Sequence, residues 1–374
     1  MTVLPANVPP DPVDVAPPAD KTVVTTIGAA TKFLYTGNPP IQTGVAPGTI
    51  KEIQAAVLRG RVIGRDNAPL PGVKITILNH SEFGQTFSRA DGMFDMAVNG
   101  GGLLTVNYAK DGYLPLQRQM NVPWQDYAVV HDVCMISFDP NVTTIDLTSS
   151  TPILIARGGK VVDSPAPRQS TLLFKQGTTA TLTLPNGSTQ PLTTLHVRAT
   201  EYTVGSMGPL AMPAELPPTS GYTYAVEYSI DEAVAAGARD VQFNQAVVSY
   251  EENFLNFTVG TIIPAGSYDR TKGMWLPSNS GRVIRVLAIN SGLADLDIDG
   301  SGQAANISAL AALGVNDAER QALAMLYTTG RTLWRTPINH FSPWDKNWGF
   351  GPPPDAQPPK QPGSRSNSSP NSPT

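Results

Sequence analysis

Apolar and polar residues alternate in short runs between Val57 and Tyr113. Each run places mostly apolar residues at every second position and ends at Gly, Asn, Asp or Pro. This period of two is typical of half-buried strands separated by tight turns. The runs are Leu58/Gly60/Val62, Val73/Ile75/Ile77, Phe94/Met96/Val98 and Leu104/Val106/Tyr108. The pattern predicts at least four strands with short connections, which form a small β-sandwich.

A second set of strand-like runs follows between residues 140 and 290. These runs are rich in Val, Ile, Thr and Tyr, and turns such as Pro185-Asn186-Gly187 separate them. About eight such runs predict a second sandwich or barrel. The segment DEAVAAG, which ends at Gly237, predicts a short helix closed by glycine.

The pattern changes again in residues 291–350. The stretch ISALAALGVNDAERQALAMLY predicts two short helices, with a break at Gly314 and a cap at Asn316 or Asp317. Large aromatic residues then crowd into TLWRTPINHFSPWDKNWGF. Such residues either pack back on the preceding β domain or insert into a partner surface. We predict that four of them bind a partner: Trp334, Phe341, Trp344 and Trp348.

Composition supports a mainly β, multidomain chain. The 374 residues include 33 Gly and 35 Pro, and charged residues make up only 15%. This composition favours turns over long helices. The predicted segments are a disordered Pro-rich arm (1–24), an ordered strap (25–52), a β-sandwich (53–138), a second β-rich domain (139–290), a segment with an acidic loop, short helices and aromatic residues (291–350), and a disordered Pro/Ser-rich tail (351–374).

Charge and cysteine content exclude several partners. The net charge is -4 and no Lys/Arg cluster is present, so we predict neither nucleic acid nor an anionic membrane as a partner. No apolar run approaches the roughly 18 residues of a membrane span. The first residues lack a basic start and an apolar core, so we expect no classical signal peptide. The single cysteine, Cys134, predicts neither an intramolecular disulfide nor a zinc site.

One acidic stretch, DLDIDGSGQAAN, resembles a calcium-binding loop. Asp295, Asp297 and Asp299, followed by Gly300, stand at positions one, three, five and six of an EF-hand-like spacing. Position eight is glycine, and position twelve is Asn306 where a bidentate Glu is the rule. Two interpretations remain open: a weak Ca²⁺ site at the three aspartates, or a plain acidic turn.

No constellation of residues predicts catalysis. A glycosidase needs two carboxylates that face each other across a sugar, and no spacing in the sequence establishes such a pair. The candidate carboxylates are Glu201, Glu227, Asp231, Glu232, Glu251, Glu252 and Asp269. His340 has no metal-ligating companions, and Trp124 is either a ligand platform or a core or interface anchor. We predict a non-enzymatic protein with no cofactor beyond the possible Ca²⁺.

Four motifs in the first sandwich resemble a known accessory domain. They are Gly60-Arg61-Val62, Pro69-Leu70-Pro71-Gly72-Val73, Ala90-Asp91-Gly92-Met93-Phe94 and Asp111-Gly112-Tyr113. Their order and spacing are similar to those of the carboxypeptidase-regulatory-like domain, a transthyretin-like (prealbumin-type) sandwich. The resemblance implies the fold but no activity, because a fold by itself does not fix a function.

A longer series of motifs, spanning roughly residues 30 to 356, resembles the region that precedes the YD-repeat shell in bacterial Rhs-type polymorphic toxins. It includes FLYTGNPPIQTGVAPGTI, SRADGMFDMAVNGGG, ADLDIDGSG and LWRTPINHFSPWDKNW. These toxins are related to teneurins and to the shell subunits of toxin complexes. In that family the repeats form a hollow β cocoon, and the preceding β domains plug its open end.

The resemblance implies a structural role and a shell as the partner. This chain has no YD repeat and no toxin domain, so we expect it to be a fragment or a stand-alone relative. The hypothesis is a module that caps a YD-repeat shell, in cis or as a separate chain, and is secreted or held at the cell surface by a non-classical route. The alternative is a Ca²⁺- or carbohydrate-binding adhesion module.

Overall fold

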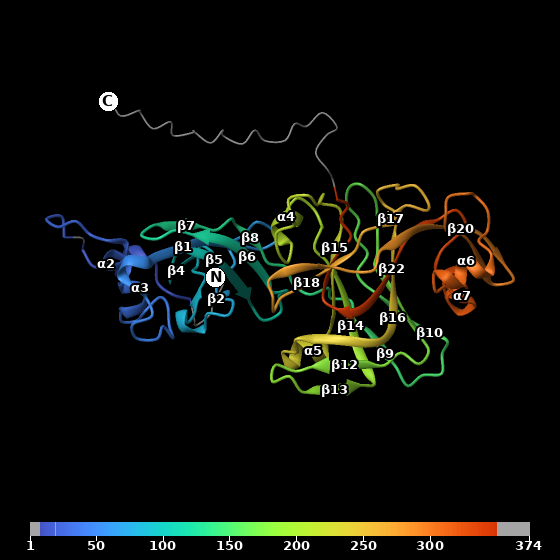
Figure 1. Cartoon of the computed structure of the whole chain (residues 1–374), viewed down its shortest axis with the longest axis horizontal. Helices are drawn as coiled ribbons and strands as arrows, with labels where there is room; N and C mark the ends of the chain where they lie inside the picture. Colours follow the sequence, from blue (N-terminus) through green and yellow to red (C-terminus); the bar gives the residue numbers. More distant parts are fainter. Residues whose placement is uncertain (1–7, 19, 350–374) are drawn as a thin grey trace, which may run out of the picture.

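The computed structural model of the chain describes residues 8–18 and 20–349. Strands dominate it, and they form two β units that lie side by side along the long axis (Figure 1). Residues up to about 138, in blue and teal, build the first unit, and the residues that follow build the second. The predicted mainly β fold class is confirmed.

The first unit is a sandwich of two four-stranded sheets. One sheet has the order β4-β1-β7, with β8 also paired to β1, and the other has the order β3-β2-β5-β6. Apolar residues from both sheets, such as Leu58 and Val106, meet in one core. The strands are β1 (Ala55–Ile63), β2 (Lys74–Ile77), β3 (Thr86–Phe87), β4 (Met93–Asn99), β5 (Gly102–Ala109), β6 (Leu116–Val122), β7 (Tyr127–Val129) and β8 (Val133–Cys134). The alternating runs of the sequence therefore lie in strands.

The predicted strap covers the outer face of this sandwich. It contains α2 (Ile27–Thr31), α3 (Phe33–Thr36) and the 3₁₀ turn η1 (Glu52–Gln54), whereas the sequence predicted irregular chain. Leu34 of α3 is buried in one cluster with Val57 of β1. Within the predicted N-terminal arm, α1 (Pro12–Val15) forms one helical turn. Residues 1–7 and 19, and the predicted tail at 351–374, lie outside the described residues.

The second unit contains a nine-stranded and a six-stranded sheet. The larger sheet has the central order β10-β11-β16-β22-β20-β17, and the smaller has the order β19-β18-β23-β15-β14-β9. Their strands are β9 (Thr143–Asp146), β10 (Ile153–Arg157), β11 (Thr171–Lys175), β12 (Ala180–Thr183), β13 (Thr189–Leu192), β14 (Thr194–Glu201), β15 (Ala225–Ile230), β16 (Asp240–Glu252), β17 (Ile262–Ile263), β18 (Gly266–Asp269), β19 (Met274–Pro277), β20 (Gly281–Asn290), β21 (Leu293–Asp297), β22 (Thr332–Phe341) and β23 (Pro343–Asp345).

Three of the four short helices in the second unit lie where the sequence predicts them. The four helices are α4 (Gly208–Ala211), which was not predicted, and α5 (Asp231–Ala236), α6 (Ile307–Ala312) and α7 (Asp317–Leu326), which were. Gly237 ends α5 with a φ of 58°, and the side chain of Asn316 caps α7 by accepting a hydrogen bond from the amide of Glu319. No helix within the described residues is long and apolar enough to cross a bilayer.

The predicted boundary near residue 290 does not separate two bodies. Strand β22 lies in the middle of the nine-stranded sheet, between β16 and β20. Strand β23 lies between β15 and β18 in the six-stranded sheet. The C-terminal segment therefore closes both sheets of the second unit, and it belongs to that unit's core.

Candidate functional site

An apolar contact joins the two β units. Ile63, Cys134 and Ile136 of the first unit share a buried cluster with Tyr202 and Met212 of the second. Burial raises the pKa of the Cys134 thiol, although Arg65 opposes that effect. A buried thiol in such surroundings is chemically inert, so this cysteine serves packing.

Arg118 of β6 reaches across the junction. Its guanidinium is buried and donates to the carbonyl oxygens of Leu210 at 2.8 Å and Met212 at 3.0 Å. Burial lowers the pKa of Arg118. The acceptors are carbonyls near α4, so this arginine fixes the backbone of the second unit instead of forming an ion pair.

The β18–β19 hairpin of the second unit lies against the same strand. The hydroxyl of Tyr268 donates to Gln117 Oε1 at 2.6 Å, and Gln117 Nε2 donates to the carbonyl of Arg270 at 2.9 Å. Gln119 Nε2 donates to the carbonyl of Gly273 at 2.8 Å. Because these bonds join two residues of β6 to three positions of the hairpin, they fix the hairpin in one register on β6.

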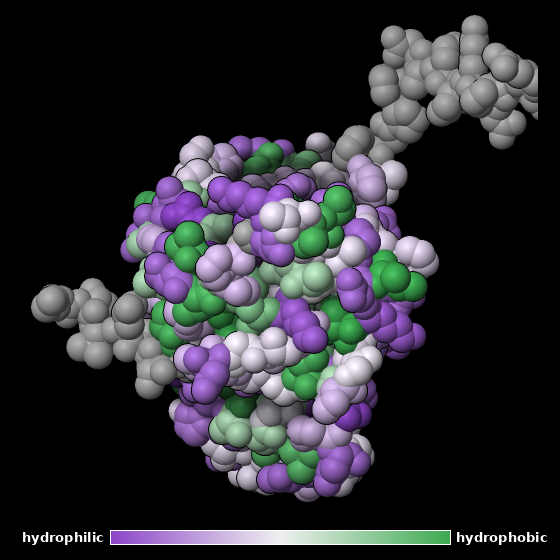
Figure 2. Space-filling model, turned by 90° about the vertical axis from the view of Figure 1, so that its left-hand side faces the viewer, coloured by the Kyte–Doolittle hydropathy of each residue, from purple (hydrophilic) through white to green (hydrophobic). Residues whose placement is uncertain are grey.

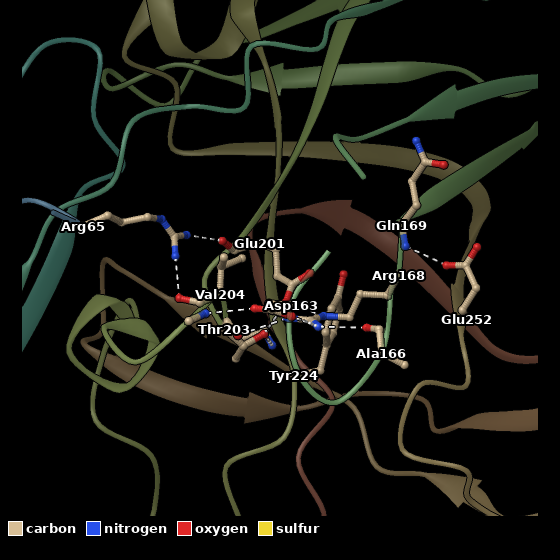
Figure 3. Close-up of polar contacts among 12 residues, drawn as sticks. Arg65, Asp163, Ala166, Arg168, Gln169, Glu201, Thr203, Val204, Tyr224 and Glu252 are labelled. Carbon is tan, nitrogen blue, oxygen red and sulfur yellow. Dashed lines mark hydrogen bonds and ion pairs between the residues drawn. The ribbon is translucent and has the colours of Figure 1, made fainter. Parts of the chain in front are cut away.

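A third polar contact between the two units is made by Arg65 (Figure 3). Its guanidinium donates to the carbonyl oxygens of Glu201 at 2.6 Å and Val204 at 2.8 Å. On the other side of that segment, Arg168 binds the Glu201 carboxylate at 2.5 Å and also pairs with Asp163. Burial raises the pKa of Glu201, and the Arg168 guanidinium opposes this rise.

The carboxylates considered for catalysis hold chain segments in place. Five of them have a cationic partner: Glu201 with Arg168, Glu227 with Arg270, Asp231 with Arg198, Glu251 with Lys346 and Asp269 with Lys272. Glu232 accepts the backbone amide of His196 at 3.1 Å. Glu252 accepts the backbone amide of Gln169 at 2.6 Å. This pairing is what buried or half-buried carboxylates need for stability.

Three of the four predicted partner anchors lie in this chain's own core. Trp334 and Trp344 are 0% exposed and Phe341 is 5% exposed. Trp334 Nε1 donates to Asn253 Oδ1 at 2.8 Å, and the Phe341 ring lies 4.8 Å from that of Phe243. The three side chains therefore have no surface left for a partner, which corrects the prediction. They pack back on the β domain because β22 and β23 are internal strands.

Trp348, the fourth predicted anchor, is half-buried. Its ring stacks on Phe257 with centroids 4.1 Å apart, and its Nε1 donates to the carbonyl of Ile262 at 3.1 Å. Ile262 itself is exposed at the edge strand β17. This is the one predicted aromatic anchor that reaches the described surface.

In the acidic loop, the three aspartates bind groups of this chain. Asp297 is buried and accepts the backbone amides of Gly300 at 2.8 Å and Gly302 at 3.0 Å. Asp295 pairs with Arg320 at 2.9 Å, and Asp299 accepts the amide of Ser301. Within the described residues, no three His, Cys, Asp or Glu side chains come together to hold a metal ion. The turn's own amides and Arg320 thus occupy several oxygens of the three aspartates, which favours the interpretation as an acidic turn.

Trp124 is fixed on the surface of the first unit. It is 55% exposed, and its Nε1 donates to the carbonyl of Gly100 at 2.8 Å. A Cβ at Gly101 would lie 2.1 Å from that nitrogen, so the glycine admits the ring. Trp124 is thus not a core residue.

On the end of this unit that faces away from the second, apolar and polar side chains are interspersed (Figure 2).

Sequence analysis missed the arginines of the junction. One signal was present: Arg118 stands at an alternate position between Leu116 and Met120, on the apolar face of its strand. A cation in an apolar run indicates a buried polar partner. Nothing in the sequence marks Arg65, because it follows the strand β1 in a turn.

With this geometry established, the class of the first unit is clear: residues 50–135 match the family model of the Teneurin TTR-like domain. The predicted transthyretin-like sandwich is thereby confirmed. Mouse Teneurin-3 is 33% identical over 119 residues, which are 30% of this chain and 4% of the relative. Human Teneurin-1 is 35% identical over 105 residues, which are 27% of this chain and 4% of the relative. The chain thus covers only a small part of these relatives.

Solved structures show only distant similarity. The 3-chlorocatechol 1,2-dioxygenase of Rhodococcus opacus has 11% identity and a TM-score of 0.19, over 22% of this chain and 60% of that one. The major pilin BcpA of Bacillus cereus has 11% identity and a TM-score of 0.19, over 67% of this chain and 80% of that one. Similarity this weak carries no functional argument.

Proposed function

We propose that the chain is a non-enzymatic structural module that caps the YD-repeat shell of an Rhs- or teneurin-like protein. The observation that carries the proposal is the junction, where the TTR-like unit is held to a second β unit by the buried Arg118, the half-buried Arg65 and apolar packing. A rigid two-part body loses little conformational entropy when it docks, which is what a cap requires.

The docking surface of the proposed cap is the end of the second unit that carries β17 and Trp348. Ile262 there is 48% exposed and lies beside the half-buried indole of Trp348. Exposed aliphatic and aromatic groups around a hydrogen-bonded tryptophan are typical of an interface centre. Gly349, the last described residue, forms a bridge with Ser220 at the same place.

The test is binding of this chain to a separately expressed YD-repeat shell. An Ile262→Asp variant is expected to weaken binding by about tenfold or more, because a charge is buried at the interface without a partner. The matched control is Ile289→Asp. Ile289 is 40% exposed on β20 of the same sheet, near the end of β20 that is distant from Arg282, the residue that pairs with Ile262. No binding by the unmodified chain, or equal loss in both variants, rejects the proposal.

A second candidate is a carbohydrate-binding adhesion module, and Trp124 favours it. An exposed indole whose Nε1 is fixed by a hydrogen bond to a glycine turn offers a stacking surface for a sugar ring. Glycan-array binding that a Trp124→Ala variant loses supports this candidate. A chain that binds glycans equally well with and without Trp124 does not use the platform.

A further inference from the structure

A groove of about 590 Å³ opens in the second unit between three connections that are distant in sequence. Its walls come from residues 157–169 between β10 and β11, residues 252–256 after β16, and residues 326–332 between α7 and β22. The floor is rigid because Arg168 and Asn253 are buried and Arg168 lies 4.6 Å from the Phe254 ring centre. The groove is therefore a preformed feature of the fold.

The groove carries uncompensated positive charge. Arg157, Lys160 and Arg331 line it, and across residues 8–18 and 20–349 none of them forms an ion pair with a carboxylate. Arg157 uses Nε to donate to Thr171 Oγ1 at 3.2 Å. Arg168 differs, because Asp163 and Glu201 neutralise it. Three charges at the rim remain available to a ligand.

One carboxylate shares the groove with these cations. Glu252 accepts the Gln169 amide at 2.6 Å and so joins two of the walls (Figure 3). A small dianion such as phosphate at the same place is repelled by Glu252. A ligand whose negative charges are spread along a chain can place each of them beside a cation and avoid Glu252.

Apolar side chains line the groove together with the cations. Pro167, Phe254 and Leu326 line the groove, and the buried Tyr327 ring completes the wall. A groove lined by both cations and apolar groups matches an extended peptide that carries carboxylates and aliphatic side chains.

We propose that this groove binds an acidic, extended peptide segment of a partner. Its carboxylates pair with Arg157, Lys160 and Arg331, and an intervening apolar side chain packs against Pro167 and Leu326. The proposal is independent of the capping role, because the lining of the groove includes neither Ile262 nor Trp348.

The probe is the acetylated and amidated pentapeptide Glu-Asp-Leu-Asp-Glu, with its Gln/Asn counterpart as the uncharged reference. We expect saturable binding of the acidic peptide by calorimetry, which weakens as salt increases. The variant Arg157→Gln/Lys160→Gln/Arg331→Gln is expected to lose affinity by about tenfold or more. Its thermal unfolding midpoint is the check that the fold is retained.

The control variant is Lys74→Gln/Arg239→Gln, which removes two exposed cations outside the groove. Unchanged affinity in this control supports the groove. Equal loss in the control, equal binding of the uncharged peptide, or no loss in the triple variant overturns the proposal. If inorganic phosphate displaces the peptide at an equal concentration, the groove is a site for small anions. That result also overturns the proposal.

Discussion

The ammonium group of Lys346 lies against the carboxylate of Glu251, and both side chains are 0% exposed. Glu251 Oε1 also accepts hydrogen bonds from Ser170, Tyr228 and Ser249. The pair connects the segment after β23 to β16 of the opposite sheet. Burial lowers the pKa of Lys346, and Glu251 opposes this effect. The core of the second unit thus contains a fully satisfied ion pair.

The first prediction concerns this pair. Lys346→Met is expected to reduce the free energy of unfolding by about 3 kcal/mol, because it leaves the Glu251 charge buried without a cation. The double variant Glu251→Gln/Lys346→Met is expected to recover most of that loss, since no charge remains. Urea unfolding measures both. A double variant that is as unstable as Lys346→Met alone contradicts the prediction.

A second prediction uses pH. Burial raises the pKa of Asp345 from 3.8 to about 6, although the Asn347 side chain and the Gly266 amide oppose the rise. The folded state therefore favours the protonated acid, and this stabilisation, present below the unfolded pKa of 3.8, is lost as the pH rises through about 6.

Asp345→Asn is expected to raise the unfolding free energy at pH 8 by roughly 1–2 kcal/mol, after a discount for partial exposure. The gain is expected to disappear below about pH 4. Thermal unfolding of both proteins between pH 3 and pH 8 measures it. A gain that is the same at every pH points to packing and rejects the ionisation argument.

A third prediction addresses the acidic loop. Asp297→Ala is expected to destabilise the protein by about 1–3 kcal/mol, because the amides of Gly300 and Gly302 lose their acceptor. Addition of Ca²⁺ or EDTA is expected to leave the unfolding midpoint of the unmodified protein unchanged. The exposed Asp299, replaced by Ala, is the control with a smaller effect. An unfolding midpoint that rises when Ca²⁺ is added contradicts the prediction and supports a calcium site in this loop.

A fourth prediction tests the junction. Arg118→Met removes two hydrogen bonds to the second unit and is expected to cost about 1.5–3 kcal/mol. Amide hydrogen exchange is expected to accelerate around α4 and the β18–β19 hairpin. Arg61→Met on β1, a half-buried position of the same unit, is the matched control. Unchanged exchange at α4 in the Arg118 variant shows that apolar packing alone holds the units together.

The fifth prediction separates the aromatic residues. Trp344→Ala is expected to cost about 3–5 kcal/mol because it leaves a cavity between the sheets. Trp348→Ala is expected to cost less, since that ring is partly exposed and can be replaced by water. Chemical denaturation of the two variants gives the comparison. Equal stability losses place Trp348 in the same core as Trp344.

Parts of the fold could be predicted from the sequence, for definite reasons. The first sandwich follows from apolar residues at every second position, because a strand exposes alternate side chains to opposite faces. The short helices follow from Gly237 and Asn316, since termini need specific backbone conformations and caps. The segment 291–349 was predicted less well, because the polar residues Arg335 and His340 interrupt the apolar alternation of β22.

The candidate site was less accessible to sequence reasoning. Asp295, Asp297 and Asp299 have the spacing of metal ligands, yet Asp297 turns to the loop amides and Asp295 to Arg320. The spacing of these aspartates shows that their carboxylates could approach one cation. It does not show that backbone amides and Arg320 bind the same carboxylates instead.

The sequence by itself determined the local structure: the strands, the turns, the capped helices and the TTR-like sandwich. Those features depend on residues that are close together along the chain. The spacing of apolar side chains and the backbone preferences of Gly, Pro and Asn can be read directly from the sequence. Only the tertiary structure decided that Trp334 and Trp344 are core residues, that Arg65 and Arg118 join the two units, and that a basic groove forms. These three features depend on which segments, distant in sequence, pack together in the fold. A side chain's burial and partners are set by that packing, and its neighbours along the chain do not reveal them.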